Sequence, residues 1–244
     1  MNVLLFGAES ADIRPELEKY DNLVLVHENP EVVVCYGGDG TLLAAEHVWP
    51  GIPKVPIRNS HRGKRMMGFP VADIIRRLHE GSLVRTEYMK LECNLNRAER
   101  KIPPHLIVAL NEVNVHMARI NSAVRFKMWI NDEPYMSGLE VLGDGFVIST
   151  PFGSTAYFNH ITRGFFHEGI GIAFKSTCEH TNHLVVPENA RIRILVTRGP
   201  AILTYDNSNE FIDLHEKDEL NVARHAHSAV CLTWDSVRYP SHAF

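Results

Sequence analysis

The sequence lacks several features that would place it in a special class of protein. It has four cysteines in 244 residues, and no two of them form a Cys-x-x-Cys pair. Scattered cysteines of this kind are typical of reduced residues in a cytoplasmic protein. No apolar run approaches the length of about 18 residues that indicates a membrane span. The opening Met-Asn-Val-Leu-Leu-Phe-Gly has no basic start and is too short for a signal peptide. We therefore expect a cytoplasmic globular protein with no membrane partner.

Neither sign of charge is in large excess. The chain has 25 Lys and Arg against 29 Asp and Glu, which gives a formal net charge of −4. Because the basic residues are scattered, the sequence gives no electrostatic reason to expect a nucleic-acid partner. Histidine is more plentiful, with 14 residues, but the pairs at 180/183 and 225/227 have no acidic or cysteine partner at a recognisable spacing. We therefore predict no metal held by protein side chains alone.

The two commonest nucleotide-binding motifs are also absent, but a different glycine-rich segment is present. The Lys of G-x-x-x-x-G-K-[ST] is missing, and G-x-G-x-x-G would need glycines at Glu9 and Asp12. Instead, Gly-Gly-Asp-Gly-Thr at 37–41 follows the apolar run 32–36 and precedes the helix-like run 42–49. Three glycines around a carboxylate let the backbone approach an anion, and a helix start adds unpaired N–H donors. The segment is either a phosphate-binding loop with its own acid or base, or a tight turn.

Strand-like and helix-like segments alternate over residues 1–86. The predicted strands are 3–6, 23–26 and 32–36, and the predicted helices are 13–20, 42–49 and 71–79. This alternation predicts an α/β domain with a parallel sheet. The 37–41 loop then lies at the carboxyl end of a strand, where such sheets bind ligands.

From residue 87 onward, short β-like runs predominate. They are 106–110, 124–130, 146–149, 192–196, 201–205 and 230–234, with a hairpin turn expected at 131–133 and a helix after Ser154. The sequence thus predicts an α/β domain over 1–86, a β-rich domain over 87–235 and a short tail over 236–244. For that tail, a return to the first domain is left open.

Two further segments carry polar residues at the ends of predicted strands. Asn111-Glu112 closes one strand, and Gly143-Asp144-Gly145 precedes another that leads into Thr-Pro-Phe-Gly-Ser-Thr-Ala-Tyr at 150–157. Taken singly, each is an ordinary turn or cap sequence. Taken together and in this order, they resemble the NAD kinase family, whose members carry G-G-D-G-T, then N-E or N-D, then G-D-G and T-P-x-G-S-T-A-Y. The match covers residues 32–49 and 105–158, with weaker similarity at 59–69 and 176–187.

The resemblance implies both a fold and a reaction. The fold is a Rossmann-like α/β domain with a parallel sheet, of the type found in diacylglycerol kinases and phosphofructokinases, followed by a mostly β domain. The reaction is transfer of the terminal phosphate of ATP to the 2′-hydroxyl of the adenosine ribose of NAD, which gives NADP. Magnesium is implied by the ATP chemistry, with phosphate and water as most of its ligands. A homodimer or homotetramer is implied as well.

The resemblance also assigns roles to particular residues. Asp39 would be the general base, while Thr41 is expected to cap the helix that follows. The residues expected to hold nucleotide phosphates are Gly37, Gly38, Gly40 and Thr41. The residues expected to bind NAD are Asp39, Gly40, Asn111, Glu112, Asp144, Thr155, Ala156, Tyr157 and His160.

The sequence departs from the family pattern at three places, and these keep two alternatives open. A long basic loop that includes His61, Arg62, Lys64 and Arg65 is either a grip for a phosphate donor or a solvated loop. His160 stands where many members have a small polar residue, and Leu142 stands where many have a basic one. The alternatives to an NAD kinase are another small-molecule or lipid kinase with the same loop, and a catalytically weak NAD(P)-binding regulatory protein.

Overall fold

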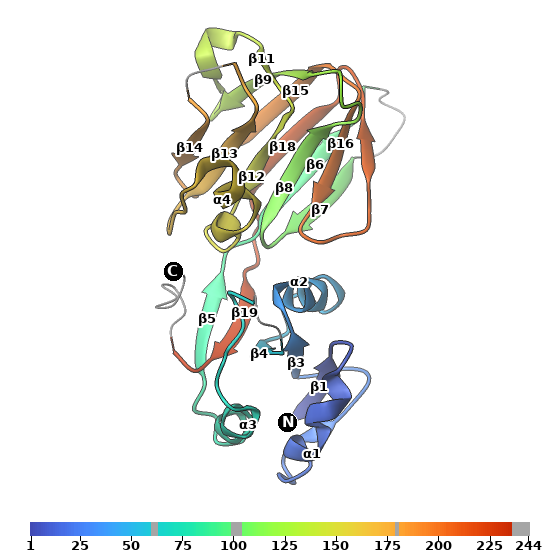
Figure 1. Cartoon of the computed structure of the whole chain (residues 1–244), viewed down its shortest axis with the longest axis vertical. Helices are drawn as coiled ribbons and strands as arrows, with labels where there is room; N and C mark the ends of the chain where they lie inside the picture. The colour runs from blue at the N-terminus through green and yellow to red at the C-terminus, as the bar shows by residue number, and fades with distance from the viewer. Residues whose placement is uncertain (60–62, 99–103, 179–180, 236–244) are drawn as a thin grey trace. The chain divides into compact units, whose positions relative to one another are not determined.

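The computed structural model describes residues 1–59, 63–98, 104–178 and 181–235. The chain forms two compact units (Figure 1). The first contains residues 1–88 and the described residues from Ser228 onward, and the second contains Met89–His227. The tail at 236–244 lies outside the described residues, so its predicted return to the first domain stays a prediction.

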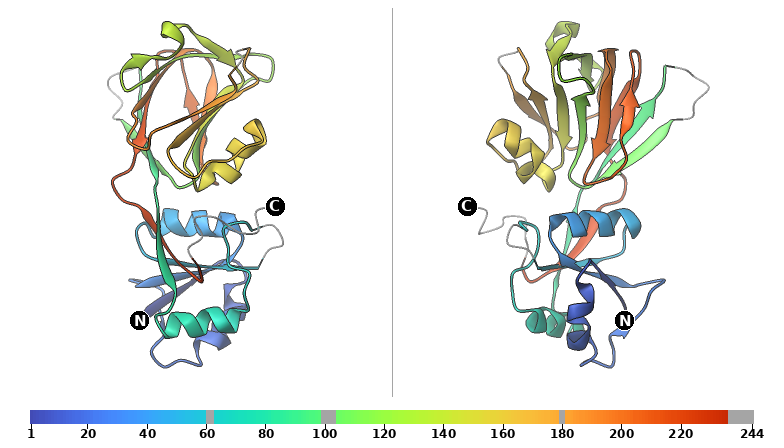
Figure 2. Two further views of the ribbon diagram at one scale, coloured as in Figure 1. Left: turned by 90° about the vertical axis from the view of Figure 1, so that its left-hand side faces the viewer. Right: turned by 45° about the vertical axis from the view of Figure 1, so that its right-hand side comes forward.

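The first unit is a three-layer α/β structure. Its sheet has the order β2-β1-β3-β4-β19-β5, in which every neighbouring pair is parallel except β19 and β5. Helix α2 lies on one face of the sheet, and α1 and α3 lie on the other (Figure 2). The strands are β1 (Asn2–Phe6), β2 (Val24–Leu25), β3 (Val32–Gly37), β4 (Lys54–Arg58), β5 (Val84–Tyr88) and β19 (Ala229–Thr233). The helices are η1 (Ser10–Ile13), α1 (Arg14–Leu17), α2 (Asp39–Val48) and α3 (Val71–His79).

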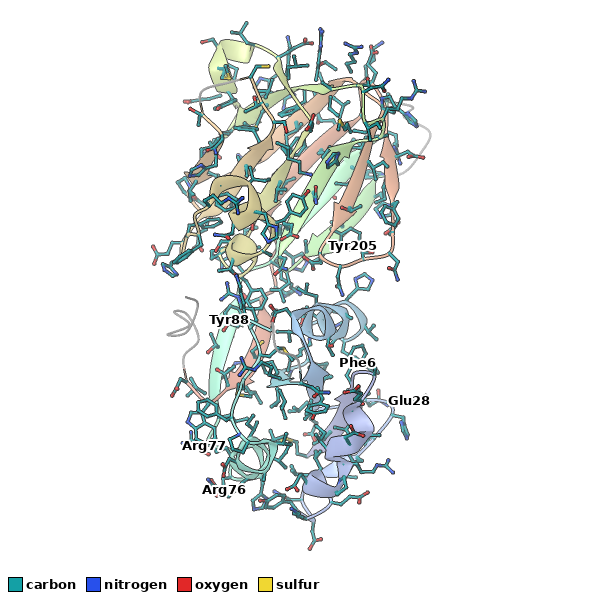
Figure 3. All side chains as sticks on the ribbon, viewed as in Figure 1. Phe6, Glu28, Arg76, Arg77, Tyr88 and Tyr205 are labelled. Carbon is teal, nitrogen blue, oxygen red and sulfur yellow. The ribbon has the colours of Figure 1, made fainter. Side chains whose placement is uncertain are left out.

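The apolar pattern of the sequence explains these layers. Strand β3 is buried on both faces, as a central parallel strand between helical layers must be, and it reads as a continuous run of Val, Cys and Tyr. Helix α3 instead carries one apolar stripe, Ile74, Ile75 and Leu78, and basic side chains such as Arg76 and Arg77 elsewhere (Figure 3). The predicted parallel-sheet α/β fold is confirmed.

The second unit is a sandwich of two antiparallel sheets. One has the order β10-β9-β15-β18-β6-β7, with β11 also paired to β9, and the other has the order β14-β13-β12-β8-β16-β17. The strands of the first sheet are β6 (Leu91–Asn96), β7 (His105–Ala109), β9 (Val124–Ile130), β10 (Glu133–Pro134), β11 (Val141–Gly143), β15 (Ile192–Arg198) and β18 (Glu219–Arg224). Those of the second are β8 (Glu112–Met117), β12 (Gly145–Ser149), β13 (Ile170–Lys175), β14 (His183–Val186), β16 (Ala201–Tyr205) and β17 (Ile212–Leu214). The unit also contains η2 (Tyr135–Gly138), η3 (Gly153–Thr155) and α4 (Tyr157–Thr162).

The core of the second unit lies between its two sheets. Phe126 of one sheet meets Phe146 and Phe174 of the other, with ring centroids 4.8 and 6.3 Å apart. Helix α4 packs on the opposite face of the second sheet (Figure 2). Phe158 of this helix is buried against Val147 and Ala173. That sheet is therefore covered on both faces around β12 and β13.

The structure differs from the predicted elements at two places. The helix predicted over 13–20 is only η1 followed by the four-residue α1, because the chain turns directly after it: Tyr20 N–H donates to the Leu17 carbonyl, and Leu23 N–H donates to the Tyr20 carbonyl. The strand predicted over 230–234 within the second domain is β19, which pairs with β4 and β5 of the first unit. A strand's apolar pattern does not reveal which sheet it joins, so the sequence placed the domain boundary at 235 instead of 227.

Candidate active site

The Gly-Gly-Asp-Gly-Thr segment joins β3 to α2 in the first unit. Gly38 is the N-cap of α2, and Asp39 is its first helical residue. The Asp39 carboxylate accepts two backbone hydrogen bonds, from Lys64 N–H to Oδ2 at 3.0 Å and from Arg65 N–H to Oδ1 at 2.8 Å. Each oxygen keeps acceptor capacity for a further donor. The loop thus presents a fixed, half-buried carboxylate at the carboxyl end of a parallel strand.

Gly37 is required by the close approach of Thr41. A Cβ at residue 37 would lie 2.2 Å from Thr41 Oγ1. The Gly37 carbonyl also accepts the N–H of Asn59, at 2.9 Å, which fixes the loop to the segment after β4. Thr41 lies inside the first turn of α2, and Gly38 is the cap, so the prediction that Thr41 caps the helix is wrong. The reason is that the helix begins within the motif itself, at Asp39, three residues earlier than its apolar pattern indicates.

The basic loop folds back onto the first unit's sheet. Met67 donates its N–H to Pro56 at 2.8 Å, and Arg58 donates to Met67 at 2.9 Å. This return is what brings the backbone of Lys64 and Arg65 to Asp39. The predicted phosphate grip also involves His61 and Arg62, which lie outside the described residues, so it stays a prediction.

In the second unit, Glu112 begins β8 and is 6% exposed. The entry to this strand is held by Asp206, which follows β16 directly after Tyr205 (labelled in Figure 3). The Asp206 carboxylate accepts the N–H groups of Leu110, Asn111 and Glu112 at 2.8, 2.6 and 3.2 Å. In return, Asp206 N–H donates to the Glu112 carbonyl at 3.0 Å. The Asn111-Glu112 pair is thus fixed by a carboxylate from another strand.

Lys175, the last residue of β13, interacts electrostatically with both Glu112 and Asp144. Its side chain is buried, and its Nζ donates to the carbonyl of Val115 at 2.9 Å and to Asn114 Oδ1. The residue beside it on β12 is Gly145. Gly145 has a φ of +131°, and a Cβ there would lie 2.1 Å from the Val115 carbonyl oxygen. This glycine is therefore required by both its backbone conformation and its space.

Tyr157 and His160 lie on α4, and Tyr157 faces the same lysine. Lys175 Nζ is 4.8 Å from the centroid of the Tyr157 ring, a cation–π arrangement. The rings of Tyr157 and His160 stack with centroids 6.3 Å apart and 24° between their planes. Thr155 and Ala156 end η3 and cap α4, and both are half-buried. Lys175 thus contacts Tyr157 and acts electrostatically on Glu112, while His160 stacks on the Tyr157 ring.

Burial changes the protonation of the two charged groups at the centre of this cluster. Burial and the neighbouring Asp206 raise the pKa of Glu112 to about 8, against the opposing effect of Lys175. Burial lowers the pKa of Lys175 to about 8, against the opposing effects of Glu112 and Asp144. The two groups therefore titrate close to neutral pH, whereas isolated Glu and Lys side chains do not.

Sequence reasoning missed Lys175 and Asp206. Each stands at the end of an apolar strand, as Asn111-Glu112 does. A charged residue in that place was the sequence signal that could have identified both. Among residues 1–59, 63–98, 104–178 and 181–235, no three His, Cys, Asp or Glu side chains gather as a metal site requires. Within the same ranges, no helix is long and apolar enough to cross a membrane.

Comparison with known proteins identifies the family of this arrangement. The family model of the ATP-NAD kinase C-terminal domain matches residues 110–233, which include Glu112, Asp144, Tyr157 and Lys175. The chain belongs to the ATP-NAD kinase family. An NAD kinase of Aquifex aeolicus is 29% identical over 213 residues, which cover 82% of this chain and 75% of that protein.

Two solved structures of this family share the fold. A yeast NADH kinase in complex with NADH superposes with a TM-score of 0.81 at 19% identity, covering 97% of this chain and 75% of that one. An NAD kinase from Archaeoglobus fulgidus in complex with ATP gives a TM-score of 0.76 at 17% identity, covering all of this chain and 96% of that one. The family's α/β unit and β-sandwich unit are therefore both present in this chain.

Proposed function

We propose that this protein is an NAD kinase, which transfers the terminal phosphate of ATP to the 2′-hydroxyl of the adenosine ribose of NAD. The observation that carries the proposal is the fixed Asp39 carboxylate in the Gly-Gly-Asp-Gly-Thr loop. It occurs in a chain whose residues 110–233 match the ATP-NAD kinase C-terminal domain. The ATP-bound and NADH-bound relatives support the two classes of substrate.

In the proposed reaction, Asp39 accepts the proton of the ribose 2′-hydroxyl. The ribose oxygen then forms a bond to the γ-phosphorus of ATP, and the bond from that phosphorus to the β,γ-bridging oxygen breaks, so that ADP leaves. The first turn of α2 and the glycines 37, 38 and 40 would offer N–H groups to the phosphates. Positioning and charge neutralisation supply most of the rate in reactions of this kind.

Magnesium enters this proposal as part of the substrate, Mg-ATP. No described cluster of side chains is built to hold a resident metal ion. Phosphate oxygens and water suit Mg²⁺ as ligands, and it commonly keeps several waters when it binds beside a nucleotide. The chain's own part would be to orient the phosphates around the ion.

The second unit would recognise the dinucleotide. Asn111, Glu112 and Asp144 offer oxygen acceptors for ribose hydroxyls or amide N–H groups. Tyr157 is 39% exposed and offers a ring face, with Thr155, Ala156 and His160 beside it. We propose these residues as the NAD-binding set. A homodimer or homotetramer remains part of the proposal and is measured by light scattering of the purified chain.

A coupled assay tests the function. The purified chain is incubated with Mg-ATP and NAD, and NADP is read with an NADP-specific dehydrogenase. We expect NADP to form, and we expect Asp39→Asn to bind NAD yet lose at least about a hundredfold in rate, the lower range for removal of a general base. The exposed Asp73→Asn on α3 is the matched control.

The same assay separates the alternatives. NAD binding without NADP formation would indicate a regulatory member of the family. ATP consumption that requires another alcohol would indicate a different small-molecule kinase. Turnover of Asp39→Asn near that of the wild type would refute the role given to Asp39.

A further inference from the structure

Lys175 is an unusual residue for the middle of a folded unit. It is 5% exposed, although a lysine almost never loses contact with water unless it has a partner. Its ammonium donates to Asn114 Oδ1 and to the Val115 carbonyl, both on β8. Strand β12 lies between β13 and β8, and its residue beside Lys175 is Gly145, which has no side chain. These two acceptors are neutral. The balancing negative charges come from Glu112 and Asp144.

Charged and titratable groups lie around the pair formed by Glu112 and Lys175, and they come from several elements. Lys175 comes from β13, Asp206 from the end of β16 and Asp144 from the turn before β12, while His116 lies on the same face of β8 and Tyr157 lies on α4. Three carboxylates against one ammonium make this cluster unfavourable for a phosphate. It suits a neutral hydrogen-bond donor such as a ribose hydroxyl.

Glu112 has an oxygen that such a donor could use. Its Oε2 atom is buried and has no hydrogen-bond partner among the described residues. A buried acceptor of this kind normally has a partner, so the Oε2 atom points to a ligand group. A carboxylate accepts a hydrogen bond more strongly when it is ionised, and a nearby ammonium favours the ionised form.

We propose that Lys175 is a positioning residue of the NAD site, whose buried ammonium favours the ionised form of Glu112, the form that accepts a hydrogen bond from a ribose hydroxyl of the dinucleotide. This inference rests on the proposed function, because it takes NAD as the ligand. Lys175 of β13 would thus influence substrate recognition indirectly, through Glu112 of β8. It assigns no proton transfer to Lys175.

The test is NAD binding by isothermal titration calorimetry on the full chain. We expect Lys175→Met to weaken NAD binding about tenfold or more near neutral pH, the range for a hydrogen bond to a charged group. Because the positive neighbour is gone, the pH at which binding reaches half its maximum should move upward in this variant. Lys127→Met, on the outer face of β9, is the matched control and should bind as the wild type does.

A double-mutant comparison separates positioning from structural damage. If Lys175 acts through Glu112, Glu112→Gln and the double variant Glu112→Gln/Lys175→Met should bind NAD equally well. The comparison of these two variants still tests the proposal if Lys175→Met alone does not fold. Titration with adenosine and with nicotinamide riboside shows which ribose is recognised, since only the matching nucleoside should bind more weakly to Lys175→Met.

Three outcomes would overturn the role of Lys175. They are NAD binding by Lys175→Met within twofold of the wild type, a further loss in the double variant beyond Glu112→Gln, and unchanged binding of both nucleosides. If the wild type itself does not bind NAD, it is the proposed function that fails, so the two failures are distinguishable.

Discussion

Removal of the Asp206 carboxylate should destabilise the second unit more than any exposed substitution. Asp206 is the acceptor for three consecutive backbone N–H groups at the start of β8. Two of the three donors belong to Leu110 and Glu112, which are 1% and 6% exposed. In Asp206→Ala these groups lose their acceptor in a place with little access to water.

The magnitude follows from the hydrogen bonds. A bond to a charged group contributes about 1.5 to 3 kcal/mol, so three bonds at the lower figure give about 4.5 kcal/mol. Bonds that share one acceptor are not additive, and removal of Asp206 also relieves its repulsion of Glu112, so we expect a loss of about 3 to 4 kcal/mol. That is a large part of the roughly 5 to 15 kcal/mol by which a folded protein is stable.

Urea unfolding followed by circular dichroism measures this loss. Asp206→Asn keeps the shape but presents an amide N–H₂ to at least one backbone donor, so we expect it to be nearly as unstable as Asp206→Ala. The matched control is Asp213→Ala on β17, which is exposed and should change the free energy of unfolding by less than about 0.5 kcal/mol. A loss below about 1 kcal/mol in Asp206→Ala would refute the reasoning, since one bond alone should contribute more than that.

Two further predictions concern buried charges. Glu46 and Lys54 form an ion pair in which both side chains are buried, so Glu46→Ala should cost about 3 to 5 kcal/mol in urea unfolding. The double variant Glu46→Ala/Lys54→Met should recover most of the lost free energy of unfolding, because it no longer buries an unpaired lysine. A double variant no more stable than Glu46→Ala would contradict this explanation. Glu112, with its pKa raised to about 8, binds a proton in the native state between its ordinary pKa and pH 8, whereas the unfolded chain does not. Its contribution to stability therefore falls as pH rises through that window, by up to about 1.4 kcal/mol per pH unit. The stability of Glu112→Gln relative to the wild type should rise from pH 5 to pH 8, and a constant difference across that range would contradict the raised pKa.

The sequence by itself determined the elements and the family. The continuous apolar run of β3, the single apolar stripe of α3 and the alternation along β9 each follow from the environment that these residues require. The order of the glycine-rich and acidic segments was enough to predict the NAD kinase family, because their spacing is set by the elements that carry them. Local chemistry and periodicity therefore give the fold class and most strand positions.

Only the tertiary structure decided which distant residues meet. Strand β19 joins the first unit's sheet through the pairing of Cys231 with Lys54, a long-range contact that leaves no trace in the strand's own pattern. Lys175 and Asp206 likewise look like ordinary strand ends until the register of β8, β12 and β13 places Lys175 in one row with Gly145 and His116. Burial then shifts the pKa values of Lys175 and Glu112, because the cost of removing a charge from water depends on packing and not on residue type.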